Sequence, residues 1–367
     1  MATSVPPVVY RLATEDEIAD AEAFNPIGEQ TWRGEFFSPL KPGSVLAIAR
    51  SESQVVGTEG YISYPLMADG CSIMTHRSER TLVSPTMRGR GVFNALIESC
   101  SATVREEKSA FCWGSTTALK PFQNAGFHAY TGYRTYLMIP LFPSRMFSLS
   151  FWRKTGMSAG LGAILRRLRQ RELPAVKEAL GVATLAMSFR AVLRLGGLRL
   201  GVLSHESAPR AHADIDDLHQ RVTAADSAVS LQHSPELFAW IQERVGHELV
   251  MICSYNEDVL CAYLCVLVKA GSNVAELVDF CAASPSNLLA ALAALRDRLR
   301  STGASSLFVA VNTQNRQQAE VLSTLEPYAP VRIRDVGRFV VRPEALEDKS
   351  MYHDLRRWYL TDLWLLM

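Results

Sequence analysis

Two arginines and two glycines alternate in the sequence Thr81-Leu-Val-Ser-Pro-Thr-Met-Arg-Gly-Arg-Gly-Val-Phe-Asn-Ala-Leu96. The residues before this loop predict a strand, and those after it predict an amphipathic helix. Such a loop turns backbone N–H groups toward one point at a helix N-terminus, where the helix dipole also favours an anion. The glycines let the backbone approach a diphosphate, and the arginines add positive charge. The spacing fits neither the phosphate loop G-x-x-x-x-G-K-S/T nor the dinucleotide motif G-x-G-x-x-G.

The residues around this loop predict one α+β domain. Alternation of apolar residues, rich in Val, Ile and Tyr, predicts strands, and apolar residues three and four apart predict helices. The expected elements are a hairpin of strands at 44–50 and 54–64, a strand at 73–83, a helix from 91 to 108, a strand at 110–114, a short helix at 117–124 and a strand at 130–140.

The second half of the chain repeats this order of elements. The expected elements there are a hairpin of strands at 249–254 and 259–269, a strand at 274–281, a helix at 288–300, a strand at 307–311, a helix at 316–325 and a strand at 331–341. A repeat of this kind predicts an internal duplication of about 190 residues.

A basic segment, 151–201, separates the halves. It contains ten arginines and lysines against two glutamates. Three arginines interrupt its most apolar part, which disfavours a membrane-spanning helix. One interpretation is a helical linker with solvated arginines, and the other is a surface for an anionic membrane or a phosphate-bearing acceptor. The predicted organisation is a first domain at 1–145, a basic helical linker at 146–205, a second domain at 206–345 and a C-terminal tail at 346–367.

The composition predicts a globular protein of two domains, since 48% of its 367 residues are hydrophobic and 20% are charged. Its 38 lysines and arginines nearly balance 37 acidic residues, which argues against a nucleic-acid partner. The sequence lacks a membrane-spanning apolar run and a secretory signal, so we expect a cytoplasmic protein, with the basic segment allowing a peripheral contact with the inner membrane. Seven cysteines without a C-x-x-C pair, and scattered histidines, predict that it uses no metal.

The loop resembles the acyl-CoA diphosphate loop of the GNAT acyltransferase superfamily, R/Q-x-x-G-x-G/A. Arg88, Gly91 and the preceding Val83-Ser-Pro-Thr86 match it, whereas Phe93 stands where the family usually has glycine or alanine. The resemblance implies two tandem GNAT-like domains and acetyl-CoA or another acyl-CoA as the cosubstrate. The CoA contacts that it implies in this loop are Leu82, Val83, Arg88, Gly89, Arg90, Gly91, Val92 and Phe93.

A second run, 115–127, resembles the superfamily pattern N-x-x-A-x-x-x-Y-x-x-x-G-F. Ala118, Gly126 and Phe127 fit this pattern. Ser115 stands at the asparagine position and Phe122 at the usual tyrosine position, and both are further expected CoA contacts. The phenol that many family members use to reprotonate the leaving CoA thiolate is therefore missing. Another group or water does this work, or the thiolate leaves readily without it.

The corresponding connection in the second half, Asp279-Phe-Cys-Ala-Ala-Ser-Pro-Ser-Asn287, has no glycine and no arginine. We therefore expect one acyl-CoA per chain, in the first domain. The tandem arrangement and two short runs, 234–240 and 358–362, also resemble bacterial GNAT proteins associated with surface-polysaccharide biosynthesis.

N-acylation requires a group that takes a proton from the attacking amine. Arg77, Glu79 and Thr81 alternate onto one face of the strand at 73–83, and Glu79 is the best-placed candidate base. The alternative is a strand-end glutamate that only pairs with Arg77 or Arg80. His76 points to the opposite face and is a weaker candidate.

The leading hypothesis is an acyl-CoA-dependent N-acyltransferase, most simply an acetyltransferase. Its acceptor would be a primary amine of a small molecule, such as an amino sugar of a surface polysaccharide, which attacks the thioester directly. One alternative is an aminoacyl or peptidyl transferase that acts on a cell-wall precursor. The other is a non-catalytic acyl-CoA-binding protein.

Overall fold

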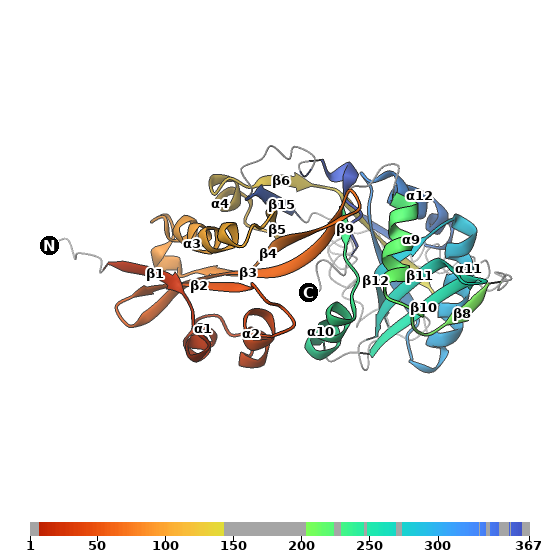
Figure 1. The fold of residues 1–367 in the computed structure, drawn as a ribbon, viewed down its shortest axis with the longest axis horizontal. Coiled ribbons are helices and arrows are strands. Elements are labelled where there is room, and N and C mark those ends of the chain that lie inside the picture. The colour runs from red at the N-terminus through yellow and green to blue at the C-terminus, as the bar shows by residue number, and fades with distance from the viewer. Residues whose placement is uncertain are drawn as a thin grey trace, which may run out of the picture. The chain divides into compact units, whose positions relative to one another are not determined.

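The computed structural model describes residues 7–142, 203–223, 229–245, 248–268, 274–329, 331–334, 338–344, 352 and 354–361. Within these ranges the chain forms two compact units, each built on a mixed sheet with helices (Figure 1). The first unit consists of Met1–Gly132, Ala228–Arg244 and Val336–Trp358, and the second of Tyr133–Ser227, Val245–Asp335 and Tyr359–Met367. The predicted α+β fold class is confirmed.

The sheet of the first unit contains eight strands among the described residues. They are β1 (Val8–Leu12), β2 (Val45–Ser51), β3 (Gln54–Ala68), β4 (Cys71–Val83), β5 (Phe111–Thr116), β6 (His128–Thr131), β9 (Val229–Leu231) and β15 (Arg338–Pro343). Their order is β1-β2-β3-β4-β5-β15-β6, with β9 paired to β3. β4 and β5 are parallel, and the other pairs are antiparallel. The structure confirms the predicted strands β2 to β5, whereas β1 and β9 were not expected.

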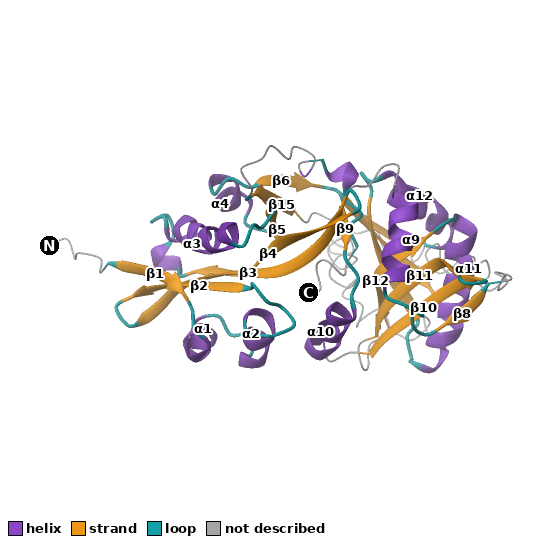
Figure 2. Cartoon of the chain, viewed as in Figure 1, coloured by secondary structure: helices purple, strands orange, loops and turns teal. Residues whose placement is uncertain are grey.

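Helices cover both faces of this sheet (Figure 2). The helices and 3-10 turns of the first unit are η1 (Glu15–Glu17), α1 (Ile18–Phe24), α2 (Glu29–Phe36), η2 (Pro85–Met87), α3 (Val92–Glu106), α4 (Leu119–Asn124), α10 (Pro235–Val245) and η6 (Leu355–Arg357). α3 and α4 lie on one face, and α1 and α2 lie on the other. α3 buries Val92, Leu96, Cys100 and Val104 against the sheet, as the spacing of apolar residues predicts.

The second unit repeats this plan. Its strands are β7 (Arg134–Pro140), β8 (Ser204–Glu206), β10 (Glu248–Asn256), β11 (Val259–Val268), β12 (Val274–Ala282), β13 (Ser306–Asn312) and β14 (Val331–Arg334). Its helices and 3-10 turns are α9 (Ala213–Thr223), α11 (Pro285–Arg298), η3 (Leu299–Ser301), α12 (Arg316–Leu325) and η4 (Glu326–Tyr328). The strand order is β14-β7-β13-β12-β11-β10-β8, and β12 and β13 form the parallel pair. The predicted elements from 249 to 325 are confirmed.

The final strand of each half belongs to the sheet of the other half. β7 follows β6 in the chain, yet it lies in the second sheet between β13 and β14. β15 follows β14, yet it lies in the first sheet between β5 and β6. The single strands expected at 130–140 and 331–341 are therefore each two strands in different sheets. Their apolar alternation continues across the break, so periodicity does not reveal which sheet accepts each part.

The strand exchange makes both units discontinuous, which differs from the continuous domains expected at 1–145 and 206–345. The expected tail at 346–367 also contributes to both cores. Tyr352 and Trp358 pack on Phe111 of the first unit, with ring centroids 4.5 and 5.2 Å away. Gln318 of the second unit donates to the Leu360 carbonyl at 2.7 Å.

The basic segment at 151–201 lies outside the described residues, so its expected helical linker and anionic partner stay predictions. In the described ranges, the helices are too short or too polar to cross a membrane.

Candidate functional site

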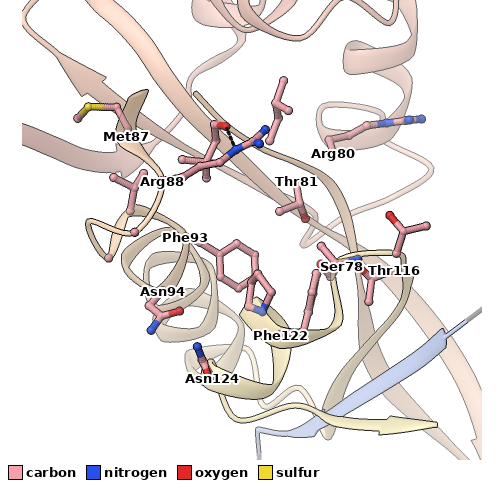
Figure 3. A pocket seen from close by; sticks show the side chains of 18 of the residues that line it. Ser78, Arg80, Thr81, Met87, Arg88, Phe93, Asn94, Thr116, Phe122 and Asn124 are labelled. Atoms are coloured by element: carbon pink, nitrogen blue, oxygen red, sulfur yellow. Dashed lines mark hydrogen bonds between the residues drawn. The ribbon is translucent and has the colours of Figure 1, made fainter. Parts of the chain in front are cut away.

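A cleft of about 900 Å³ opens in the first unit where β4 and β5 diverge (Figure 3). Over their described lengths the two strands pair at only two positions, His76↔Cys112 and Arg77↔Trp113. Beyond these pairs, residues 78–83 of β4 line one side of the cleft and the end of β5 lines the other. The edge of β4 that faces the cleft therefore offers backbone donors and acceptors to a bound chain-like ligand.

The glycine loop borders this cleft and leads into α3. Gly89 has φ of +76° and Gly91 has φ of +80°, in the left-handed region that favours glycine. Among the residues that the structure describes, no side chain caps the start of α3. Its first N–H groups have no intrahelical partner, because a helix leaves those donors unpaired. The loop thus presents a helix N-terminus suited to an anion.

The two arginines of the loop have different positions. Arg88 lines the cleft, and its Nε donates to the Val83 carbonyl at 3.2 Å. Both side chains are exposed, but Arg90 is not among the cleft-lining residues, and the CoA contacts expected of the two arginines stay predictions. The other predicted site residues all line the cleft: Glu79, Leu82, Val83, Gly89, Gly91, Val92, Phe93, Ser115 and Phe122.

Phe93 and Phe122, the two aromatic residues that depart from the GNAT sequence patterns, contact each other. The rings of Phe93 and Phe122 lie edge to face with centroids 5.0 Å apart, and Phe122 also packs on Phe127 at 5.1 Å. Phe93 and Phe122 both line the cleft, and Phe122 is buried. Phe93, at the usual glycine position, thus packs against Phe122, at the usual tyrosine position. Neither side chain has a hydroxyl group.

A β-bulge rearranges the end of β4. Glu79 pairs with Gly60 and Leu82 pairs with Thr58, so Glu59 of β3 faces two residues of β4. One of these two, Arg80, has φ of +59°.

This bulge corrects the expectation that Arg77, Glu79 and Thr81 share a face. Ser78 and Thr81 both donate to the Glu59 carboxylate, so Thr81 lies on the face of Ser78 instead. The bulge inserts an extra residue, which reverses the alternation after Glu79.

Glu79, the candidate base, forms an ion pair with Arg77. The Glu79 side chain is 17% exposed and lines the cleft, whereas that of Arg77 is 6% exposed. Glu79 therefore forms the ion pair that the sequence suggests and also borders the cleft.

His76 has a structural environment. Its Nδ1 lies 2.9 Å from Ser109 Oγ and its Nε2 lies 3.1 Å from the Gly43 carbonyl. Burial lowers the pKa of His76 to about 4, so the ring is neutral at physiological pH. It is not among the residues that line the cleft.

The bulge is held from the α2 side of the sheet. Arg80 donates through two nitrogens to Glu35 of α2, whose side chain is completely buried. Thr58 Oγ1 donates to the Arg80 carbonyl at 2.8 Å. A Cβ atom at Gly60 would lie 2.2 Å from the Phe36 ring, so α2 packs directly on the backbone beside the bulge. These contacts keep the left-handed residue in place.

Glu59 is the acidic residue that the sequence analysis misses. It is 0% exposed, and burial raises its pKa to about 8 against the lowering effect of its bonds to Ser78 and Thr81. A glutamate between Gly57 and Gly60, as the one charged residue of its strand, is the signal that could have identified it.

The second unit has a smaller cavity at the corresponding strand-to-helix connection, with a volume of about 240 Å³. There Ser284 caps α11 by accepting a hydrogen bond from the Asn287 N–H at 3.2 Å, and Pro285 at the first turn has no N–H. The helix N-terminus is thus partly satisfied by the chain itself, unlike that of α3. The expected limit of one acyl-CoA per chain stays a prediction.

The sequence matches no protein-family model and no curated protein. The fold resembles solved GNAT structures over most of the chain, so the chain consists of two GNAT-like domains. A probable N-acyltransferase from Enterococcus faecalis has 11% identity and a TM-score of 0.59, covering 92% of this chain and 72% of its own. GCN5-related N-acetyltransferases from Anabaena variabilis and Kribbella flavida have TM-scores of 0.57 each and identities of 10% and 12%. They cover 93% and 92% of this chain, and 74% and 71% of their own.

Proposed function

We propose that this chain is an acyl-CoA-dependent N-acyltransferase that binds its acyl-CoA in the β4–β5 cleft. The observation that carries the proposal is the uncapped N-terminus of α3 beside the cleft, with Gly89 and Gly91 in the left-handed conformation. N-acyltransferases and N-acetyltransferases among the similar structures support the reaction class. Acetyl-CoA is the simplest cosubstrate.

In this proposal, the CoA diphosphate binds the first N–H groups of α3 and the Arg88 guanidinium. The pantetheine arm lies along β4, where the backbone of Leu82 and Val83 offers hydrogen bonds beside the cleft. The thioester then reaches the inner end of the strand, near Ser78 and Glu79. Backbone N–H groups of the diverging strands stabilise the developing oxyanion.

The amine attacks the thioester carbonyl directly, and Glu79 takes its proton as the candidate base. Arg77 orients the Glu79 carboxylate through their ion pair. For the acceptor, we propose a primary amine of a small molecule and test amino sugars first, because short runs of the sequence resemble surface-polysaccharide proteins.

The diphosphate site is tested by calorimetric titration of CoA into two matched variants. Both arginines are exposed, but Arg88→Ala removes the one that lines the cleft, whereas Arg90→Ala removes one that does not. A charge-assisted hydrogen bond contributes roughly 1.5–3 kcal/mol, so Arg88→Ala should weaken CoA binding by about tenfold or more. Arg90→Ala should change it by less than about threefold, because Arg90 does not line the cleft and its charge is screened from the ligand by water and salt. Equal affinities in both variants would contradict the proposed site.

Turnover is tested by thiol release from acetyl-CoA with an amino sugar, an aminoglycoside and a lysine peptide. A non-catalytic acyl-CoA-binding protein is the second candidate, because Phe122 provides no hydroxyl group near the cleft. CoA binding without thiol release above the uncatalysed rate would favour that candidate.

A further inference from the structure

The buried carboxyl group of Glu59 contacts two hydroxyl residues that line the cleft. Ser78 Oγ is 2.6 Å from Glu59 Oε1, and Thr81 Oγ1 contacts the other carboxyl oxygen. Ser78 and Thr81 line the cleft, whereas Glu59 is completely buried. The bulge creates this arrangement, since residues three apart in a regular strand point to opposite faces.

The surroundings of Glu59 contain charges of both signs. Glu79 of β4 raises its pKa and Arg342 of β15 lowers it, but burial is the largest effect. Tyr61 of β3 and Cys100 of α3 also interact electrostatically with Glu59. At a pKa of about 8, roughly nine tenths of Glu59 is protonated at pH 7.

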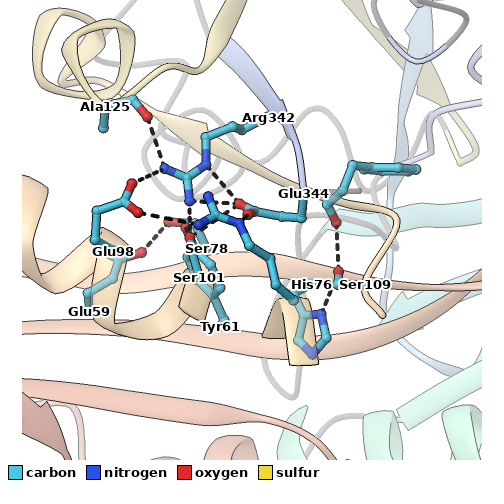
Figure 4. Close-up of polar contacts among 12 residues, drawn as sticks. Glu59, Tyr61, His76, Ser78, Glu98, Ser101, Ser109, Ala125, Arg342 and Glu344 are labelled. Atoms are coloured by element: carbon cyan, nitrogen blue, oxygen red, sulfur yellow. Dashed lines mark hydrogen bonds and ion pairs between the residues drawn. The ribbon is translucent and has the colours of Figure 1, made fainter. Parts of the chain in front are cut away.

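Arg342 is engaged by other partners (Figure 4). It donates to Glu344 at 2.7 Å and to Glu98 at 2.9 Å, and it also donates to Ser101. These contacts offset much of its charge, which is why a nearby arginine does not keep Glu59 ionised.

The protonation state of Glu59 determines whether the hydroxyl groups of Ser78 and Thr81 donate hydrogen bonds to its carboxyl group or accept one from it. An ionised carboxylate only accepts, so both hydroxyl hydrogens point to it. A protonated carboxyl donates to one hydroxyl oxygen, which frees that hydroxyl hydrogen to point into the cleft. Five hydroxyl residues line the cleft, Ser78, Thr81, Ser115, Thr116 and Thr117, and the first two contact this acid.

We propose that Glu59 supplies the proton that the CoA sulfur takes up, and that the proton passes through the hydroxyl of Thr81 or Ser78. This inference rests on the proposed acyltransferase function. The amine nitrogen forms a bond to the carbonyl carbon, and the C–S bond breaks with its electron pair on sulfur. The thiolate takes the hydroxyl proton, and the hydroxyl oxygen takes the Glu59 proton. The amine proton passes to Glu79 or water, and solvent reprotonates Glu59.

The inference fits the aromatic lining of the cleft. Phe93 and Phe122 can donate no proton to a sulfur atom. Among the five hydroxyl residues of the cleft, Ser78 and Thr81 are the two that contact the buried acid Glu59. Glu59 does not touch the substrate in this scheme and acts through the hydroxyl residues, which predicts an effect on the pH profile rather than on CoA affinity.

The test is the pH dependence of thiol release from acetyl-CoA between pH 6 and 10, using the same three amines. When the rate at each pH is divided by the fraction of acceptor amine that is unprotonated, the wild-type rate should fall about tenfold per pH unit above pH 8, because the proton donor is then ionised. Glu59→Gln should lower the rate at pH 7 by about tenfold or more and abolish this descending limb. CoA affinity, measured by calorimetry, should stay within about threefold of the wild type.

Two further variants separate proton transfer from structural damage. Thr81→Ser keeps a hydroxyl and should retain the descending limb, whereas the double variant Thr81→Val with Ser78→Ala should lose it. Glu22→Gln is the control for loss of a structural carboxylate, since Glu22 accepts bonds from the Gly28 N–H and Trp32 Nε1 and does not line the cleft. It should leave the profile unchanged. The double variant keeps the test available where Glu59→Gln does not fold.

The outcomes distinguish this inference from the proposed function. A wild type that binds no CoA or releases no thiol would overturn both. A wild type that turns over acetyl-CoA with the same descending limb in Glu59→Gln, or in the double variant, would overturn the proton path alone.

Discussion

Replacing Glu35 by glutamine should destabilise the first unit through the bulge in β4. Glu35 is completely buried and forms a two-pronged ion pair with Arg80, whose side chain is 22% exposed. Removing one partner of a buried pair costs about 3–5 kcal/mol when the remaining charge stays buried. Because Arg80 can still reach water, we expect a loss smaller than this, about 2–3 kcal/mol in the free energy of unfolding.

The same helix provides a matched control. Glu15 pairs with Arg33 of α2, but both side chains are about half exposed, at 57% and 49%. Exposed pairs contribute roughly 0–1 kcal/mol, so Glu15→Gln should change the free energy of unfolding by less than about 1 kcal/mol. Adding Arg80→Gln to Glu35→Gln removes the uncompensated charge and should recover part of the loss.

Urea unfolding followed by tryptophan fluorescence measures these differences, and hydrogen exchange of peptides from α2 and β4 shows where protection is lost. Thiol release should fall in Glu35→Gln, because the bulge at Arg80 also positions Thr81 and Glu79. If Glu35→Gln is no less stable than Glu15→Gln, the ion pair does not hold the bulge and our account of the site is wrong.

Three further predictions concern the loop, the core and the strand exchange. Gly91→Ala should destabilise the protein by about 1 kcal/mol in thermal unfolding because its φ is +80°, whereas Gly34→Ala inside α2, with no atom near the added Cβ, should stabilise it by about 0.5–1 kcal/mol. The folded protein should lose on the order of 3 kcal/mol as pH falls from 6.5 to 4, since the His76 pKa of about 4 lies below its ordinary value of 6.5 and only the neutral ring fits. His76→Gln should abolish that part of the pH dependence in urea unfolding. Residues 1–145 expressed alone should show no cooperative thermal transition by circular dichroism, because β15 is absent from their sheet, and a cooperative transition would contradict this.

Much of the fold follows from patterns that are local in the sequence. Apolar residues at helical spacing indicate α3, and the alternation around the loop indicates β2 to β5. The loop at 88–93 combines two glycines and two arginines between a strand and a helix, which predicts an anion site. Most of the predicted contacts share one cleft because they are close in sequence and flank the divergence of β4 and β5.

The acidic residues around the cleft show the limit of such patterns. A bulge depends on how two strands pair, so alternation alone placed Thr81 on the face of Glu79. Glu35 and Glu59 are polar residues in elements whose burial comes from packing against other elements. Their partners, Arg80 and Thr81, are more than 20 positions away in the chain.

The exchange of β7 and β15 is the feature farthest from the reach of sequence patterns. Both strands have the apolar alternation of a buried strand, and this property is the same whichever sheet they join. Their sheet is selected by the edge that is available for hydrogen bonding and by the side chains that fill its core, such as Val340 and Arg342 of β15. Local chemistry thus specifies which segments become strands and which loop is suited to an anion, whereas pairing between distant segments specifies how the two domains are completed.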